Sequence, residues 1–242
     1  MTELPRRTSF SGPTLVRLLS RMTQVEVAEP AQSPAARLDQ WLGWTESILL
    51  SKVLSAPAPA VSAKLGVPGS AADTDVVDVV ELARAEYAQL RDTLEQAIFT
   101  AAAPPQPLPA AQRRQLRAGV AAEQELDIQS YRRRYTMLQH KMEGNIATLR
   151  GRLRGLLAAT SPDMARLAAV DAAMEQALGE RETTVLAGLP GLLEEHFERL
   201  PQDGRNNTFL RDLSLVMKEE LDLRLQPVQG LLSAITTSQH HL

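Results

Sequence analysis

The stretch YRRRYTMLQHKMEGNIATLRGRLRGLL, residues 131–157, carries the clearest structural pattern in the chain. Apolar side chains recur along it every three or four residues: Tyr131, Tyr135, Leu138, Met142, Ile146, Leu149, Leu153 and Leu156. This spacing puts them on one face of an α-helix, in a stripe close to the heptad pattern of paired helices. We therefore expect a long helix that starts near residue 109 or 121 and ends near residue 159. At a rise of 1.5 Å per residue, ~38 residues span ~57 Å, which favours an elongated molecule.

The segment that follows predicts the partner of this helix. Ser161 and Pro162 suit the start of a new helix, which we expect to run to about residue 200 with a kink or break at Pro190. Residues 130–154 carry mostly Arg and Lys, whereas residues 163–203 carry mostly Asp and Glu. A tight turn between the two helices would lay them antiparallel, with opposite charges flanking the apolar seam.

The rest of the chain predicts more helices, separated by proline-rich stretches. Ala, Leu, Arg, Glu and Gln dominate the sequence and favour helix, whereas signals for β-strands are weak. Stretches 27–36, 55–71 and 101–111 are rich in proline, which fixes φ and removes a hydrogen-bond donor. We expect an all-α protein: a small helical part over 1–70, then an elongated antiparallel hairpin or bundle over 71–242. Its further helices are predicted over residues 14–22, 35–54, 73–100 and 208–236, the last bent at Pro227.

Composition excludes several classes of protein. The chain has 242 residues, a net charge of -3 and no cysteine. The absence of cysteine excludes disulfides, Cys-ligated zinc and a cysteine nucleophile. The small negative charge gives no overall attraction to nucleic acid. No apolar run approaches the ~20 residues of a membrane span, and Arg17 and Arg21 interrupt the stretch that a removable signal would need. We expect a cytoplasmic protein without a transmembrane segment.

Patterns that carry chemistry are also missing. The sequence contains no GxxxxGK[ST], GxGxxG, HExxH or GxSxG motif, and no Glu-x-x-His for a di-iron site. The acidic clusters, such as Glu219, Glu220 and Asp222, fit solvated helix faces. We therefore expect a protein that is not an enzyme and has no cofactor or metal. An enzyme subunit completed by a partner has only these acidic clusters in its favour.

The stretch ARLDQWLGWTESILL, residues 36–50, contains both tryptophans of the chain. It predicts either the anchor of the fold or a docking surface. We expect Trp41, Leu42 and Trp44 to contact a helical or coiled-coil protein partner. A second set is expected to pair helices, in a partner complex or a homo-oligomer: Leu138, Met142, Leu149 and Leu153. The alternative that both sets form the core of a single chain stays open.

Two further segments offer binding surfaces. The short helix over 14–22 could lie on an anionic membrane, but docking into the protein's own core or a partner groove is favoured. The alternative function is a nucleic-acid-associated regulator, which would use Arg132, Arg133, Arg134, Arg150 and Arg154. Three successive arginines spread over about 200° of a helix and cannot form one stripe along phosphates. A structural role beside the acidic helix is therefore favoured over nucleic-acid contact.

Four segments together resemble a known family. They are RTSFSGPTLVRLLSRM (7–22), RLDQWLGWTESILLS (37–51), residues 131–157 quoted above, and LDLRLQPVQGLL (221–232). In this order they resemble an uncharacterised proteobacterial family, catalogued only as a domain of unknown function. The resemblance implies members often encoded near OmpA/MotB-like proteins and long coiled-coil membrane proteins, and so an accessory part of an envelope-associated, stator-like assembly. It supplies no catalytic residue.

Overall fold

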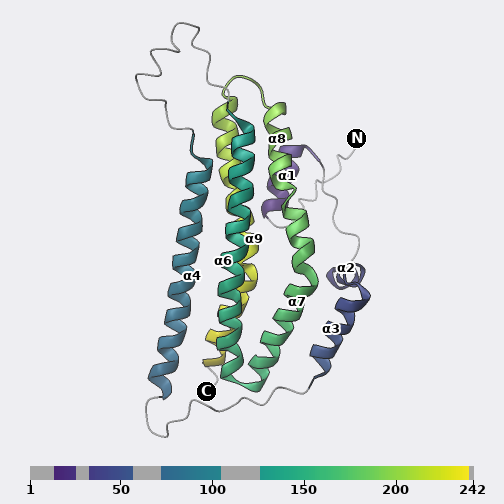
Figure 1. Ribbon diagram of the computed structural model, residues 1–242, viewed down its shortest axis with the longest axis vertical. Coiled ribbons are helices and arrows are strands. Elements are labelled where there is room, and N and C mark those ends of the chain that lie inside the picture. Colours follow the sequence, from purple (N-terminus) through teal and green to yellow (C-terminus); the bar gives the residue numbers. More distant parts are fainter. Residues whose placement is uncertain (1–13, 26–32, 57–71, 105–125, 240–242) are drawn as a thin grey trace, which may run out of the picture.

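The computed structural model describes residues 14–25, 33–56, 72–104 and 126–239, and these contain helices and no strand. The predicted all-α class is confirmed. The helices lie side by side in an elongated bundle (Figure 1). Their bounds are α1 Thr14–Thr23, α2 Pro34–Trp41, α3 Trp44–Ser55, α4 Ala72–Ala102, α6 Ile128–Thr160, α7 Pro162–Leu186, α8 Leu189–Arg199 and α9 Arg205–Gln239.

Helix α6 lies at the centre of the bundle. It packs against α4, α7, α8 and α9. Its side chains Met142, Leu153 and Leu157 are fully buried, as are Met217 and Leu225 of α9. The stripe predicted from the three- and four-residue spacing therefore forms the core of one chain, because the other long helices cover it on several sides.

The predicted antiparallel pairing of α6 with α7 is confirmed. Ser161 has an extended backbone, and its Oγ accepts a hydrogen bond from the backbone N–H of Met164 at 3.2 Å. Pro162 follows at the first position of α7, where its missing N–H costs nothing. Arg150 then reaches Asp171 at 2.7 Å, and Arg154 reaches Glu175 at 2.5 Å. The positive helix thus lies beside the negative one.

Replacing Asp171 with asparagine is expected to lower the free energy of unfolding by about 2 kcal/mol, the scale of hydrogen bonds to charged groups. The Asp171 carboxylate accepts bonds from both Arg150 and Arg154, and its side chain is only 15% exposed. Urea denaturation measures the loss. Glu81→Gln is the control, because Glu81 pairs with Arg84 at the surface and should change stability by less than about 0.5 kcal/mol. Equal losses of stability from the two substitutions would contradict a stabilising role for the ion pairs between α6 and α7.

Several helix bounds differ from the prediction. The single helix predicted over 35–54 is two helices, because Leu42 and Gly43 are extended, with ψ of 122° and 175°. The predicted break near Pro190 is confirmed: α7 ends at Leu186, and Pro190 lies in the first turn of α8. Pro227 lies inside α9.

The central and last helices also start at different residues from those predicted. Helix α6 starts at Ile128, where the Asp127 carboxylate accepts a hydrogen bond from the N–H of Ser130 at 3.1 Å. The predicted starts at residues 109 and 121 lie outside the described residues. Helix α9 starts at Arg205 rather than residue 208, directly after Gly204 makes the turn with φ of +69°.

The N-terminal helices attach at two separate places. Helix α1 packs on α9 and α8 and buries Leu15. It therefore docks on the protein's own core, one of the two arrangements that the sequence analysis favoured over a membrane surface. Helices α2 and α3 lie on the outer side of α7 (Figure 1), where α3 makes its contacts. The predicted domain division at residue 70 lies outside the described residues. No helix within the described part of the chain is long and apolar enough to cross a membrane.

Candidate functional site

The outward face of α3 exposes large apolar side chains. Trp44 is 84% exposed and Ile48, one turn further along, is 50% exposed. Helix α3 packs on α7 but contains no buried residue: Leu49, Leu50 and Val53 are half-buried, and Leu54 is 47% exposed. Large apolar side chains of a helix are normally buried against a neighbouring element. This chain covers only one side of α3.

Trp41 lies in a different environment from Trp44. It is 46% exposed, and the guanidinium carbon of Arg181 lies 4.9 Å from the centre of its ring, a cation–π contact. Together with Gly43, Glu46 and Val185 it lines an open hollow of about 490 Å³ beside α7. Leu42, between the tryptophans, is half-buried. The structure therefore brings the three predicted residues together where α2 meets α3, without placing them on one helix face.

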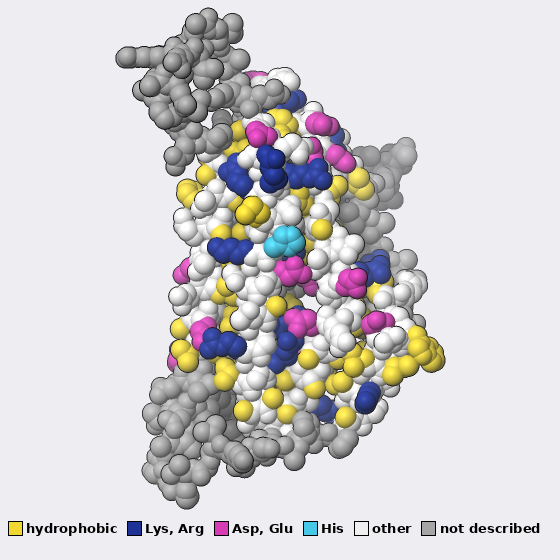
Figure 2. Space-filling view, in the orientation of Figure 1, with side chains coloured by type: hydrophobic (Ala, Val, Ile, Leu, Met, Phe, Trp, Pro, Cys, Tyr) yellow, Lys and Arg dark blue, Asp and Glu magenta, His cyan; other side chains and the backbone are white. Residues whose placement is uncertain are grey.

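The Trp segment does not anchor the fold. Figure 2 shows hydrophobic side chains gathered at the right-hand edge of the molecule, over α3. The alternative that Trp41 and Trp44 form the core is wrong, because both are exposed. Their predicted contact with a partner stays a prediction.

The four apolar residues of α6 lie inside the protein. Leu138 and Leu149 are 5% and 6% exposed, and Met142 and Leu153 are not exposed at all. They pair α6 with helices of the same chain, so their side chains are not accessible to a partner. Of the two sets predicted to contact a partner, the set on α2 and α3 is therefore the accessible one.

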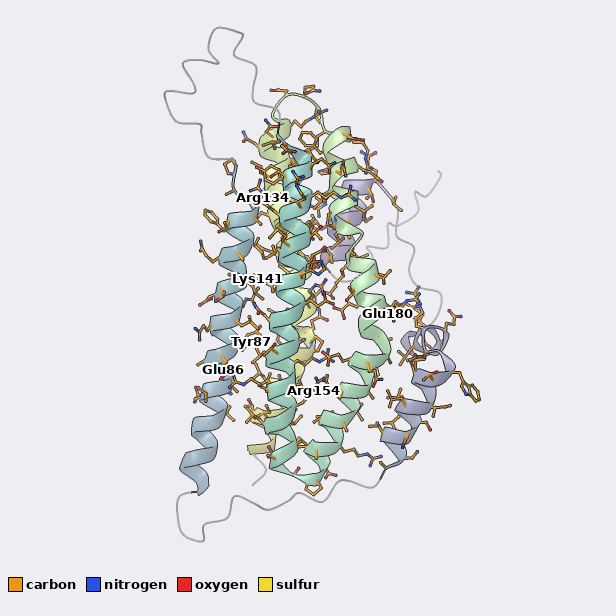
Figure 3. All side chains as sticks on the ribbon, in the orientation of Figure 1. Glu86, Tyr87, Arg134, Lys141, Arg154 and Glu180 are labelled. Carbon is orange, nitrogen blue, oxygen red and sulfur yellow. The ribbon has the colours of Figure 1, made fainter. Side chains whose placement is uncertain are left out.

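The arginines of the nucleic-acid alternative are mostly engaged within the protein. Arg132 donates to Glu194 at 2.9 Å, and Arg150 and Arg154 pair with acidic residues of α7. Arg134 donates to the carbonyl of Ala103 and stacks on the ring of Tyr131 beside the α4–α6 seam (Figure 3). Arg133 is the exception, with a 73% exposed side chain 3.9 Å from Asp127. Phosphate contacts would have to displace the other pairs.

The sequence analysis did not predict a buried polar network between α6 and α9. The Tyr135 hydroxyl donates to Glu220 Oε2 at 2.6 Å, and Arg224 Nε donates to Glu220 Oε1 at 2.8 Å. Gln139 Nε2 donates to Glu220 and also to the carbonyl of Leu186, at the end of α7. Glu220 is completely buried, so its assignment to a solvated acidic face is wrong. The helical spacing does indicate that these two residues are buried. Glu220 and Arg224 follow Met217 by three and seven residues, which places them on the core side of α9.

Raising the pH above about 10 is expected to destabilise the protein through Tyr135. Burial, and secondarily the charge of Glu220, raise the pKa of its hydroxyl well above the ordinary value near 10. The unfolded chain therefore loses this proton first, and the stability present below pH 10 falls by up to about 1.4 kcal/mol per pH unit as the pH rises. Urea denaturation between pH 9 and 11 measures the slope. Tyr135→Phe should show a shallower slope, and an identical slope in both proteins would contradict this account.

A second buried pair joins α8 to α9. His196 Nε2 lies 3.0 Å from Asp212 Oδ2, and both residues are buried. Across the described ranges, no group of three or more His, Cys, Asp or Glu side chains is arranged to hold a metal ion.

Comparison with known proteins identifies the family but no function. Residues 1–237 match the family described as protein of unknown function DUF3348, and the chain belongs to that family. No curated protein and no solved structure matches the chain.

Proposed function

We propose that this member of the DUF3348 family is a non-catalytic adaptor that docks one amphipathic helix of another protein on the outer face of α3. The observation that supports this most is the exposure of Trp44, at 84% of its surface. Tryptophan is among the residues most enriched at the energetic centres of protein interfaces. An exposed tryptophan beside further exposed apolar side chains marks a surface that a partner covers.

The pattern of side chains on α3 fits a helix as the partner. Trp44 and Ile48 form a row of large side chains at a spacing of four residues. Ser47, Ser51 and Ser55 are exposed and form a neighbouring row of small side chains at the same spacing. Two helices pack by placing the ridge of one into the groove between such rows of the other. The groove beside Trp44 therefore suits a ridge of apolar side chains, which an amphipathic helix presents at i, i+3 or i+4, and i+7.

The size of the face favours a helix over a second copy of this chain. A stable dimer buries about 800 Å² on each partner. One tryptophan supplies roughly 150–250 Å² and the neighbouring Ile48 supplies less, so these two apolar anchors make up only a small part of such an interface. A single helix needs only a few such anchors.

The class of partner rests on the family resemblance. OmpA/MotB-like and long coiled-coil membrane proteins, which the resemblance implies as genomic neighbours, include long helices that could present such a face. We therefore place the adaptor on the cytoplasmic side of an envelope-associated, stator-like assembly.

Nucleic-acid binding is not the function that we propose. Most of the arginines that would carry it are held by Glu194, Asp171, Glu175 and the carbonyl of Ala103. Retention on heparin that falls steeply with added salt would favour that alternative.

Site-specific photocrosslinking tests the adaptor proposal. A photoreactive amino acid is placed at Ile48, and in a matched variant at Leu82, which is 58% exposed on α4. We expect the Ile48 variant to crosslink in its native cell to one protein, through a helical segment and in near-stoichiometric amount, and the Leu82 variant not to. Crosslinks from Ile48 only to a second copy of the chain, or the same products from both positions, would contradict the proposal.

A further inference from the structure

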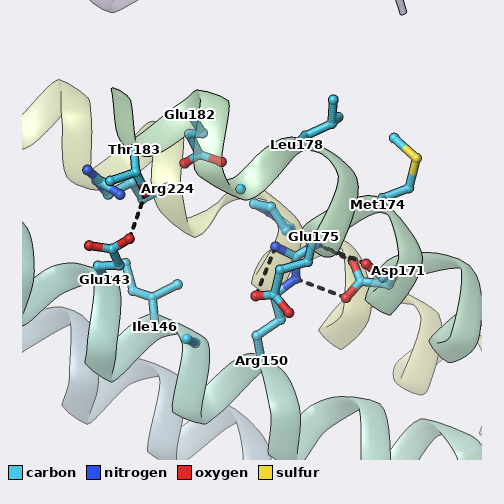
Figure 4. A pocket seen from close by; sticks show the side chains of 13 residues that line it. Glu143, Ile146, Arg150, Asp171, Met174, Glu175, Leu178, Glu182, Thr183 and Arg224 are labelled. Carbon is cyan, nitrogen blue, oxygen red and sulfur yellow. Dashed lines mark hydrogen bonds and ion pairs between the residues drawn. The ribbon is translucent and has the colours of Figure 1, made fainter. Parts of the chain in front are cut away.

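A cavity of about 440 Å³ lies between α6, α7 and α9 (Figure 4). Figure 2 shows acidic side chains beside a hollow in the middle of the same face of the molecule. Its wall includes the apolar side chains of Ile146, Met174, Leu178 and Pro227, together with six charged residues. Small-molecule sites have volumes of about 300–1,000 Å³ and combine apolar walls with a few polar groups.

Some of the charged groups in the wall neutralise one another. Arg150 donates two hydrogen bonds to the carboxylate of Asp171, at 2.9 and 2.7 Å, and also lies 3.5 Å from Glu175. Arg154, just outside the wall, adds a bond of 2.5 Å to Glu175. This end of the cavity is an internal ion-pair network and has little charge left for a ligand.

Two carboxylates in the wall lie outside the hydrogen bonds of Arg150 and Arg154. Glu143 accepts a hydrogen bond from the Thr183 hydroxyl at 2.7 Å, and one of its oxygens lies 3.9 Å from Nδ1 of His140. Glu182 makes no hydrogen bond or close ion pair within the described part of the chain, and the charge of Arg150 attracts it only from further away. Both carboxylates can therefore receive an ammonium group.

Arg224 supplies hydrogen-bond donors to the same cavity. The residue is 8% exposed and its Nε is bonded to Glu220, but no described residue accepts a bond from Nη1 or Nη2. Arg224 is part of the cavity wall, and a guanidinium matches a carboxylate with two parallel bonds. Figure 4 places Arg224 at the same end of the cavity as Glu143 and Glu182.

We propose that this cavity binds a small aliphatic zwitterion of the α-amino acid class. The ligand carboxylate accepts hydrogen bonds from Nη1 and Nη2 of Arg224. Its ammonium group lies between Glu143 and Glu182, and its aliphatic side chain packs on Ile146, Met174 and Leu178. Arg224 donors without an acceptor among the described residues, two carboxylates outside the hydrogen bonds of Arg150, and an apolar wall share one cavity. This combination carries the proposal, independently of α3.

Calorimetric titration with L-leucine as the probe tests the proposal. We expect saturable binding at one site per chain, and binding at least tenfold weaker for 4-methylpentanoate, which lacks the ammonium group, and for 3-methylbutylamine, which lacks the carboxylate. No saturable binding of L-leucine would overturn the proposal. Binding of the amine as tight as that of L-leucine would overturn it too, because Arg224 would then contribute nothing.

A cavity-filling variant locates the site without removing the buried Arg224. Gly179 lines the cavity, and a Cβ added there meets no atom within 4 Å, so the side chain of Gly179→Leu starts in open space and occupies part of the cavity. We expect this variant to fold and to lose at least tenfold in affinity, and Glu182→Gln to lose a similar factor. Gly155→Leu is the matched control, because Gly155 lies in α6 outside the cavity wall and is equally uncrowded. Equal affinity of Gly179→Leu and Gly155→Leu would place binding elsewhere and refute the proposed site.

Discussion

Replacing Glu220 with alanine is expected to lower the free energy of unfolding by about 3–5 kcal/mol, the cost of breaking a buried ion pair on one side. The substitution leaves the Arg224 guanidinium buried without its counter-charge, since the two side chains are only 0% and 7% exposed. It also removes the acceptor of the Tyr135 hydroxyl, which lies in α6, 85 residues away in the chain. Urea denaturation followed by circular dichroism measures the loss.

Two companion variants show whether the ion pair is the cause. Glu219→Ala, at the neighbouring half-buried position, should change stability by about 0.5 kcal/mol or less. Replacing Glu220 and Arg224 together with leucine and methionine should recover most of the loss, because no unpaired charge then stays buried. A Glu220→Ala protein as stable as Glu219→Ala would show that the network contributes nothing to the fold.

Replacing Trp44 with alanine is expected to weaken the binding of the partner helix by about 2 kcal/mol or more, which is roughly 30-fold in Kd. The free energy of unfolding should change by less than about 0.5 kcal/mol, because the indole is 84% exposed and its removal opens no cavity. Calorimetry or surface plasmon resonance measures the Kd of the partner identified by crosslinking for the wild-type protein and for Trp44→Ala, and so gives the ratio of the two.

Phe99→Ala is the control for Trp44→Ala. Phe99 is also aromatic and 69% exposed, but it lies on α4, on the other side of the bundle from α3. Its replacement should leave the affinity unchanged. If both substitutions weakened binding equally, the effect would reflect general surface hydrophobicity rather than a site on α3.

The central helices could be predicted from the sequence because their signals are local. The spacing of Leu138, Met142, Leu149 and Leu153 defines one face of α6 whatever covers it. Ser161 and Pro162 fix the turn between α6 and α7, and the opposite charges of these helices select their antiparallel pairing.

The candidate sites could not be predicted in the same way, because they depend on which faces the fold covers. Apolar and polar residues alternate around α3 without forming one apolar face, so periodicity does not show that Trp44 faces outward. The sequence alone predicts Glu220 to be a surface acid, because its buried partners Tyr135 and Arg224 are known only from the fold. The cavity needs three helices in place before Glu182 and Arg224 face the same space.

Fluorescence of Trp44 in a Trp41→Phe variant tests the central claim most directly, because Trp44 is then the only tryptophan in the protein. In the isolated chain we expect emission typical of an indole in water and efficient quenching by acrylamide. Addition of the partner helix that the photocrosslinking experiment identifies should shift the emission to shorter wavelength and protect Trp44 from the quencher. A bound partner that leaves both properties unchanged, or a Trp44 already protected in the isolated chain, would contradict docking on the outer face of α3.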